Sequence, residues 1–130
     1  MTATFAPAPA RSRGTVIALW TLQVLLALVF IVGSGTPKLF GEAYAVQIFT
    51  DLGTGQWLRY VVGVLEIAGG IGLLVPRFAR LAASCLIALM VGATLAQLFF
   101  LTEGFWYTPV VLGVLLGVVA WLRRPASVRA

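Results

Sequence analysis

Glu66 is the side chain in this sequence best suited to chemistry, because it is a carboxyl group inside a mostly apolar stretch, residues 58–75. A helical rise of ~1.5 Å per residue puts it about 12 Å from Leu58, near the middle of the hydrocarbon layer if the stretch crosses a membrane. A carboxylate there costs about 3 kcal/mol or more, so it normally has a partner and a function. Two interpretations remain open: Glu66 contributes to a ligand site, or it forms a hydrogen bond between helices that fixes their register.

Two basic residues compete as the partner of Glu66. Lys38 ends the sequence Gly35-Thr36-Pro37-Lys38, in which glycine and proline predict a break in the preceding helix. Such a break would direct the ammonium group inward, where a flexible lysine side chain reaches several ångströms. Arg59 lies on the same face of the predicted helix as Glu66, seven residues earlier. The sequence does not decide between Lys38 and Arg59.

Gln97 and Thr94 extend this polar set from a third apolar segment, residues 81–101. They are the remaining candidates for a ligand site, although a single glutamine in an apolar helix also serves as a hydrogen bond to another helix. The chain has no histidine and only one cysteine. It therefore lacks a disulfide, a thiol redox pair and the commonest transition-metal ligand. We expect no metal site and no catalytic residue, so a redox role would require a protein partner or a diffusible cofactor.

Composition identifies the elements that must position these side chains. Hydrophobic residues make up 61% of the 130 residues and charged residues only 10%, against about a quarter in ordinary soluble domains. The mean hydropathy is +1.03. Four long apolar segments cover approximately residues 15–34, 58–75, 81–101 and 105–122, close to the ~20 residues that cross a bilayer. We therefore expect an all-α fold, an integral membrane four-helix transmembrane bundle, between tails at 1–14 (disordered) and 123–130.

A short amphipathic helix is expected between the first two membrane segments, within residues 37–50. Pro37 is suited to a first helical turn, and large apolar side chains then recur near helical spacing. These side chains are Phe40, Tyr44, Ile48 and Phe49. The helix is expected to lie in the outer interface of the membrane.

The basic residues predict the orientation. Seven of the nine flank the membrane segments on one side: Arg11, Arg13, Arg77, Arg80, Arg123, Arg124 and Arg129. Positively charged loops remain in the cytoplasm, so both chain ends are expected there, in a bacterial inner membrane, with lipid as the surroundings. The same clustering at segment ends argues against nucleic acid as a partner.

Small residues recur at four-residue spacing on the last two segments. They are Ser84, Ala88, Gly92 and Ala96 on one and Gly113 and Gly117 on the other. Small side chains allow helix backbones to approach closely in a membrane. The pattern predicts tight packing, either within the chain or in a homodimer.

The sequence resembles the DoxX family of membrane proteins. The resemblance is carried by the runs at residues 35–40 (GTPKLF), 63–74 (GVLEIAGGIGLL) and 76–83 (PRFARLAA), and it extends from about residue 15 to 122. It implies a four-helix bacterial inner-membrane protein. The family takes its name from a small subunit of a thiosulfate:quinone oxidoreductase, and other members are linked to membrane oxidoreductase complexes. Lys38 and Glu66 match polar positions that recur in the family.

Three functional hypotheses follow. The first is a non-catalytic membrane subunit or anchor of an oxidoreductase complex, with a redox protein as partner and a cavity near Glu66 for a quinone or another small lipophilic ligand. The glycines on that face, Gly63, Gly69 and Gly70, leave space for such a ligand or for a neighbouring helix. The second is a small dimeric transporter or channel that moves a small solute or protons past Glu66. The third is a structural module for membrane assembly.

Overall fold

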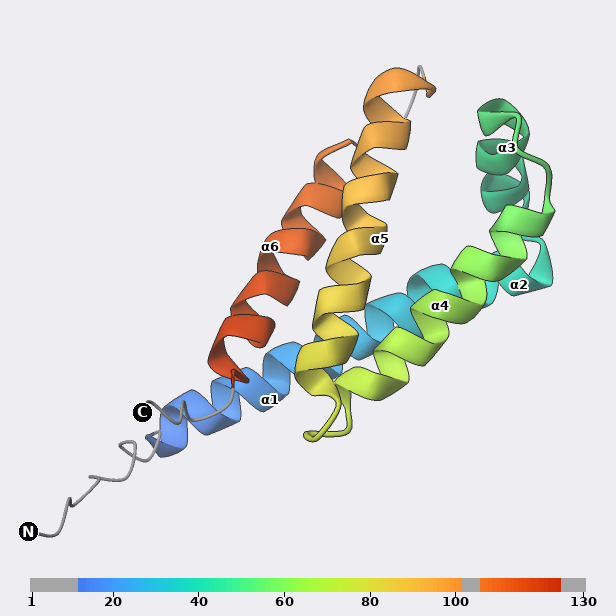
Figure 1. Ribbon diagram of the computed structural model, residues 1–130. Coiled ribbons are helices and arrows are strands. Elements are labelled where there is room, and N and C mark those ends of the chain that lie inside the picture. Colours follow the sequence, from blue (N-terminus) through green and yellow to red (C-terminus); the bar gives the residue numbers. More distant parts are fainter. Residues whose placement is uncertain (1–11, 102–105, 125–130) are drawn as a thin grey trace, which may run out of the picture.

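Every regular element in the described residues, 12–101 and 106–124 of a computed structural model, is a helix (Figure 1). The elements are α1 (Arg13–Leu28), the π-helix η1 (Val29–Gly35), α2 (Thr36–Phe40), α3 (Ala43–Leu52), α4 (Trp57–Leu73), α5 (Ala79–Phe99) and α6 (Tyr107–Leu122). The all-α class agrees with the sequence prediction. Most of the two predicted tails and the start of the fourth predicted segment lie outside the described residues.

The first helix does not break where glycine and proline predicted a break. From Arg13 to Phe40 the chain is one continuous helix, because η1 joins α1 directly to α2. The Thr36 N–H donates to the Ile31 carbonyl five residues earlier, the bond typical of a π-turn, and the Thr36 hydroxyl donates to the same oxygen at 2.5 Å. Pro37 lies in the first turn of α2, where an absent N–H does least harm. The prediction was therefore wrong in placing the end before Lys38; the end lies at Gly41, with φ 73°.

Two helices are long and apolar enough to cross a membrane: the continuous helix Arg13–Phe40, with 28 residues, and α5, with 21. The other two predicted spans are shorter than the 18 or more residues expected of them. α4 has 17 residues and α6 has 16. Length and composition thus identify two of the four expected spans.

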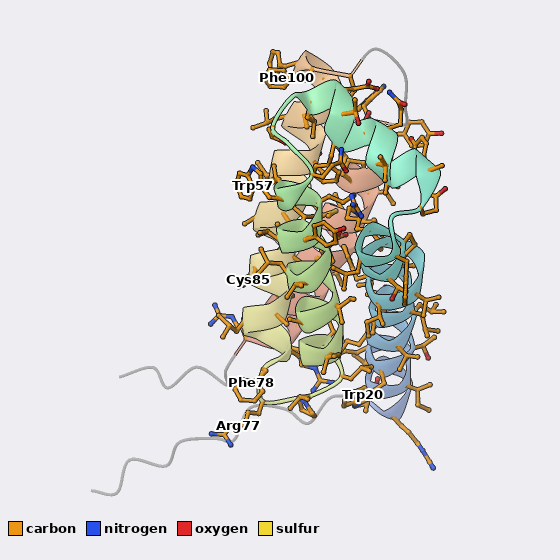
Figure 2. All side chains as sticks on the ribbon, turned by 90° about the vertical axis from the view of Figure 1, so that its right-hand side faces the viewer. Trp20, Trp57, Arg77, Phe78, Cys85 and Phe100 are labelled. Carbon is orange, nitrogen blue, oxygen red and sulfur yellow. The ribbon has the colours of Figure 1, made fainter. Side chains whose placement is uncertain are left out.

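The helices form two pairs that meet at one end of the molecule and diverge toward the other (Figure 1). α5 packs along α6, and α4 packs along the continuous helix α1–η1–α2. We call the end with the connection between α4 and α5 the turn end, and the opposite end, where α3 lies, the α3 end. Figure 2 shows Trp20, Arg77 and Phe78 at the turn end and Trp57 and Phe100 toward the α3 end.

The described arginines are segregated along this axis. Five lie in or beside the elements of the turn end: Arg13, Arg77, Arg80, Arg123 and Arg124. Lys38 and Arg59 lie toward the α3 end. The pattern of basic residues that predicted the orientation is therefore also a pattern in space.

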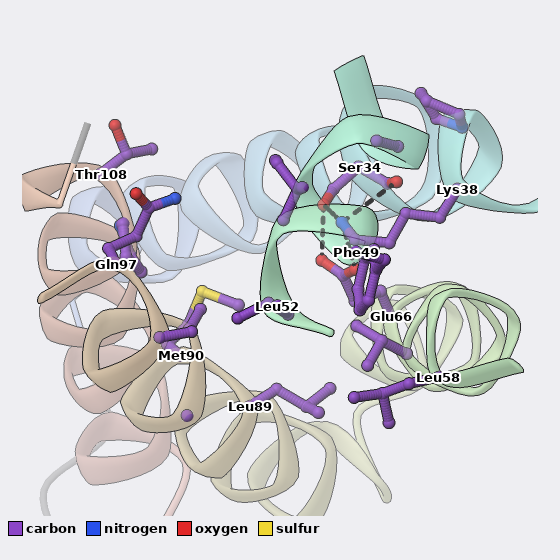
Figure 3. A pocket seen from close by; sticks show the side chains of 18 of the residues that line it. Ser34, Lys38, Phe49, Leu52, Leu58, Glu66, Leu89, Met90, Gln97 and Thr108 are labelled. Carbon is purple, nitrogen blue, oxygen red and sulfur yellow. Dashed lines mark hydrogen bonds and ion pairs between the residues drawn. The ribbon is translucent and has the colours of Figure 1, made fainter. Parts of the chain in front are cut away.

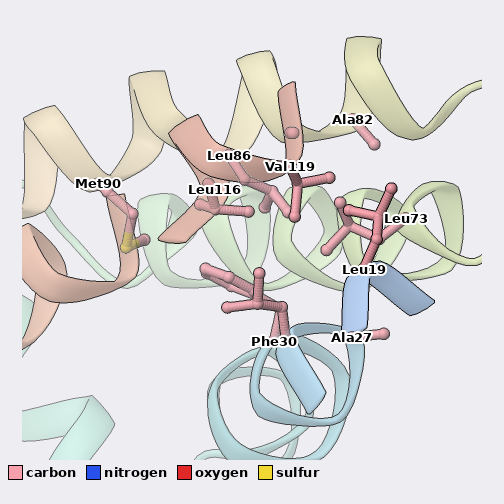
Figure 4. Close-up of a cluster of buried hydrophobic side chains, with 11 residues drawn as sticks. Leu19, Ala27, Phe30, Leu73, Ala82, Leu86, Met90, Leu116 and Val119 are labelled. Carbon is pink, nitrogen blue, oxygen red and sulfur yellow. The ribbon is translucent and has the colours of Figure 1, made fainter. Parts of the chain in front are cut away.

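An apolar core fills the turn half of the molecule (Figure 4). Its members come from α1, η1, α4, α5 and α6, and the largest fully buried side chains among them are Leu26, Phe30, Leu73, Leu86 and Leu116. A buried side-chain amide, that of Gln23, connects the helices of the turn half by hydrogen bonds. Gln23 Nε2 donates to the Leu73 carbonyl at 2.6 Å, and Gln23 Oε1 accepts from Arg123 Nε at 2.8 Å. The guanidinium of Arg123 also lies over the ring of Trp20, with Cζ 4.8 Å from the centroid. These contacts tie the ends of α4 and α6 to α1.

Glycines bring η1 and α4 into backbone contact. A Cβ at Gly35 would lie 2.9 Å from the Gly63 carbonyl oxygen and 2.8 Å from that of Phe30, and a Cβ at Gly63 would lie 3.1 Å from the Gly35 oxygen. The space beside Gly70 is filled by the side chain of Ile31, whose Cγ1 would lie 2.6 Å from an added Cβ. The space that the glycines of α4 leave is therefore filled by neighbouring helices, the second of the two alternatives open from sequence.

Gly35→Ala is expected to lower the free energy of unfolding by about 1–3 kcal/mol, because the added Cβ would overlap two backbone oxygens. Gly33→Ala is the matched control, since Gly33 lies in the same π-helix and its Cβ would meet nothing within 4 Å. We expect the control to be neutral, or stabilising by about 0.5–1 kcal/mol as is usual for a helical glycine. Thermal unfolding in detergent measures both variants, and equal effects would contradict the backbone contact.

Candidate functional site

A cavity of about 530 Å³ opens where the two helix pairs diverge. Its walls come from η1, α2, α3, α4, α5 and α6. They are mostly apolar, with side chains such as Phe49, Leu52, Leu89 and Met90 (Figure 3). Polar side chains interrupt this lining at a few points: Ser34, Lys38, Glu42, Glu66, Gln97 and Thr108.

Three of these side chains, Ser34, Lys38 and Glu66, form a closed polar triad. Lys38 Nζ lies 2.7 Å from Glu66 Oε1. The Ser34 hydroxyl donates to Glu66 Oε2 at 2.6 Å and accepts from Lys38 Nζ at 2.7 Å. Glu66 is only 2% exposed and Lys38 is 18% exposed. Both carboxylate oxygens are therefore engaged, which offsets the cost of holding Glu66 away from water.

The continuity of the first helix positions the triad. Ser34 lies in η1 and Lys38 lies four residues later in α2, so the two side chains share one helix face. The contact between Gly35 and Gly63 holds this face against α4, one turn from Glu66. Sequence reasoning missed Ser34, because the predicted break separated it from Lys38. The signal that could have identified Ser34 is its position four residues before Lys38, which places both side chains on one face of a continuous helix.

Arg59, the competing cation, does not reach Glu66. Its Nε donates to Gln56 Oε1 at 2.7 Å, and its Nη1 donates to the Lys38 carbonyl oxygen. The guanidinium lies over the ring of Tyr60, 4.3 Å from the centroid. Arg59 thus binds the last turn of α2, where carbonyl groups lack helical partners. The structure pairs Lys38 with Glu66.

The helix α3 covers the cavity at the α3 end. Its inner face contributes Ala45, Ile48, Phe49 and Leu52 to the lining. The predicted amphipathic helix exists but begins later, at Ala43, because Gly41 takes a left-handed conformation and Glu42 caps the new helix. The Glu42 carboxylate accepts from the Tyr44 and Ala45 N–H groups at 3.1 and 3.2 Å. Of the side chains predicted on the apolar face, Phe40 is exposed and does not line the cavity, whereas Tyr44 lines the cavity although it is also exposed.

Gln97 and Thr94 separate in space. Gln97 faces the cavity from α5, across from the triad (Figure 3). Thr94 does not line this cavity; its hydroxyl donates to the Met90 carbonyl at 2.8 Å, and it borders a separate shallow groove of about 340 Å³ between α5 and α6. Thr108, from α6, joins Gln97 on its side of the cavity and has no counterpart among the residues singled out from sequence.

The small-residue stripe of α5 is turned mostly away from neighbouring helices among the described residues. Ser84, Ala88 and Gly92 are exposed, and Ala88, Gly92 and Ala96 line the cavity. On α6, a Cβ at Gly113 would lie 3.6 Å from the Met90 Cβ of α5, an ordinary contact, and a Cβ at Gly117 would meet nothing within 4 Å. Contact with a second copy through these residues stays a prediction.

The arrangement is suited to binding. Among the described residues there is no group of three side chains that could hold a metal ion. What the site presents is a fixed ion pair and a hydroxyl in the wall of an apolar cavity. Such walls with a few placed polar groups are typical of sites that bind and orient small molecules.

Glu66→Gln and Lys38→Met are each expected to destabilise the protein, by less than the ~3–5 kcal/mol of a fully buried pair because Lys38 is partly exposed. The double variant should be more stable than the sum of the single effects predicts, by about 1–3 kcal/mol. Asp51→Asn, which removes an exposed carboxylate on α3, is the control and should change stability by no more than about 0.5 kcal/mol. Strict additivity in thermal unfolding would contradict the interaction.

The model of the DoxX-like family matches residues 21–119, which include the triad and most of the chain from α1 to α6. No curated protein matches the chain. No solved structure matches it either.

Proposed function

Because the chain belongs to the DoxX-like family, we propose that it is an integral bacterial inner-membrane protein in which the four long helices all cross the bilayer. α4 and α6 are shorter than the other two, yet each extends about 24–26 Å at ~1.5 Å per residue, near the thickness of the hydrocarbon layer. Exposed Trp57, Trp106 and Trp121 flank their ends, as is usual at membrane interfaces. The arginines of the turn end support a cytoplasmic location for that end and for both chain termini.

Cysteine labelling tests this topology. In a Cys85→Ser background, Thr54→Cys lies in the connection between α3 and α4, and Phe78→Cys lies in the connection between α4 and α5; both positions are exposed. A membrane-impermeant maleimide is expected to label Thr54→Cys in intact cells, and Phe78→Cys only after permeabilisation. Labelling of both positions in intact cells, or the reverse pattern, would contradict the proposed arrangement.

The function that the site supports best is that of a non-catalytic membrane subunit of an oxidoreductase complex, in which the cavity binds a quinone or a similar small lipophilic molecule. The observation that carries this proposal is the Ser34–Lys38–Glu66 triad in the wall of an apolar cavity. A volume of about 530 Å³ falls in the range of small-molecule sites. A quinone ring needs apolar walls and a polar group at a carbonyl oxygen, and the ammonium of Lys38 is such a group. Electrons would come from a redox protein partner.

Two features favour binding over the alternative functions. The packed core of the turn half closes the cavity on that side, which supports a dead-end site over a path for solutes or protons past Glu66. A structural module that uses Glu66 only to fix helix register would need no cavity beside the ion pair. The transporter alternative does not account for the closed turn half, and the structural alternative does not account for the cavity.

Mass spectrometry of the protein purified in mild detergent tests the function. We expect wild type to carry a bound quinone and a stoichiometric redox protein, and to bind added short-chain quinone saturably. Lys38→Met should weaken quinone binding by tenfold or more, about 1.4 kcal/mol, because the polar contact is lost. Asp51→Asn is the control and should bind as wild type does. Absence of saturable quinone binding to wild type would contradict the proposed site.

A further inference from the structure

Two glutamines lie inside this bundle, and their surroundings differ sharply. Gln23, at the turn end, is fully buried, and both of its amide atoms are engaged, with the Leu73 carbonyl and with Arg123. Gln97, in α5, is half-buried and faces the cavity. In the described part of the chain the Gln97 amide makes no hydrogen bond. A helix–helix hydrogen bond, the alternative open from sequence, is therefore not what holds Gln97 there.

The Gln97 amide atoms are not among the buried, unpartnered polar atoms of the described residues, so they face the open part of the cavity and can bond a ligand there. Within the part of the molecule described, no protein group forms a hydrogen bond with the Gln97 side chain. A bound molecule would do so. This is the difference expected between a glutamine that belongs to the scaffold and one that belongs to a ligand site.

Gln97 gives the cavity a second polar end. In Figure 3 it lies beside Thr108, while Ser34, Lys38 and Glu66 lie on the opposite side, and Leu52, Leu89 and Met90 lie between the two groups. The cavity is thus polar at both ends and apolar in the middle. A ligand that fills it would carry polar groups at opposite ends of an apolar ring or ring system.

The hydrogen-bonding capacity at each end defines those groups. Lys38 uses its ammonium for Glu66 and for the Ser34 hydroxyl at 2.7 Å each, while its third contact, to the Ser34 carbonyl, is long at 3.4 Å. The N–H in this long contact is the one that a ligand oxygen could take over from the Ser34 carbonyl. The Gln97 side chain carries two N–H donors on its amide nitrogen. Both ends can donate to an oxygen acceptor.

We propose that Gln97 is the second ligand contact of the cavity, and that the ligand is a lipophilic ring compound with carbonyl oxygens at two opposite ends, one bound by Lys38 and the other by Gln97. This inference rests on the proposed function and deepens it by assigning the residue that binds the second carbonyl oxygen. Gln97 acts as a specificity-determining residue, since it distinguishes a compound with two opposed carbonyl groups from one with a single carbonyl.

Two probes and two matched substitutions test the proposal. Menadione, a bicyclic dione, and tetralone, a bicyclic ketone with one carbonyl, are titrated into purified wild type, Gln97→Met and the control Gln47→Met, which makes the same substitution on the exposed face of α3. Gln97→Met is expected to weaken menadione binding about 5–10-fold and to leave tetralone binding unchanged. It should not lower thermal stability. Gln47→Met should alter neither titration.

The outcomes distinguish a failure of this inference from a failure of the proposed function. If Gln97→Met affects neither ligand, or both equally, Gln97 does not contact a second oxygen; the proposed function still stands if Lys38→Met weakens menadione binding. If wild type does not bind menadione saturably, both proposals fail. A Gln97→Met variant that loses stability would also overturn the inference, because it would show that the amide serves the scaffold.

Discussion

The rest of the structure depends on the backbone contact between η1 and α4 at Gly35 and Gly63. No side chain larger than hydrogen fits between the two helices at this point, so the contact fixes both their separation and their rotation. That rotation turns Ser34 and Lys38 toward Glu66. In an apolar environment an ion pair is stabilising only when its geometry is good and its remaining hydrogen bonds are made. The glycine contact supplies the geometry, and Ser34 supplies the remaining bond.

The two halves of the molecule have different roles. The turn half is closed by an apolar core and by the Gln23 contacts, and it holds the two helix pairs together. The α3 half is open, because the pairs diverge and α3 covers the space between them without filling it. The packed core of the turn half holds the helix pairs together, while the α3 half keeps a cavity with a charged wall. The π-helix η1 contributes to both halves, since it keeps the first helix continuous from the core to the cavity. Such π-turns are frequent at functional sites.

Local sequence patterns predicted some of this arrangement. Hydrophobic periodicity and length identified the helices, and the cost of a carboxylate in an apolar stretch identified Glu66 and led to Lys38. The break predicted at Gly35-Thr36-Pro37 was wrong, because the close packing of Gly35 on α4 outweighs the local preference of glycine and proline to end a helix. Ser34 was missed for the same reason. Neither the filling of the glycine face of α4 nor the unpartnered amide of Gln97 could be predicted, since both depend on which helices become neighbours.

Photoaffinity labelling in lipid nanodiscs tests the central claim most directly. A quinone analogue that carries a diazirine is bound to wild type and activated by light, and the modified residues are identified by peptide mass spectrometry. The account predicts labels on cavity residues such as Phe49, Leu52 and Leu89, which disappear with excess unlabelled quinone. Labels confined to the groove between α5 and α6, at residues such as Val91 and Val110, would show that the cavity beside the ion pair is not the binding site.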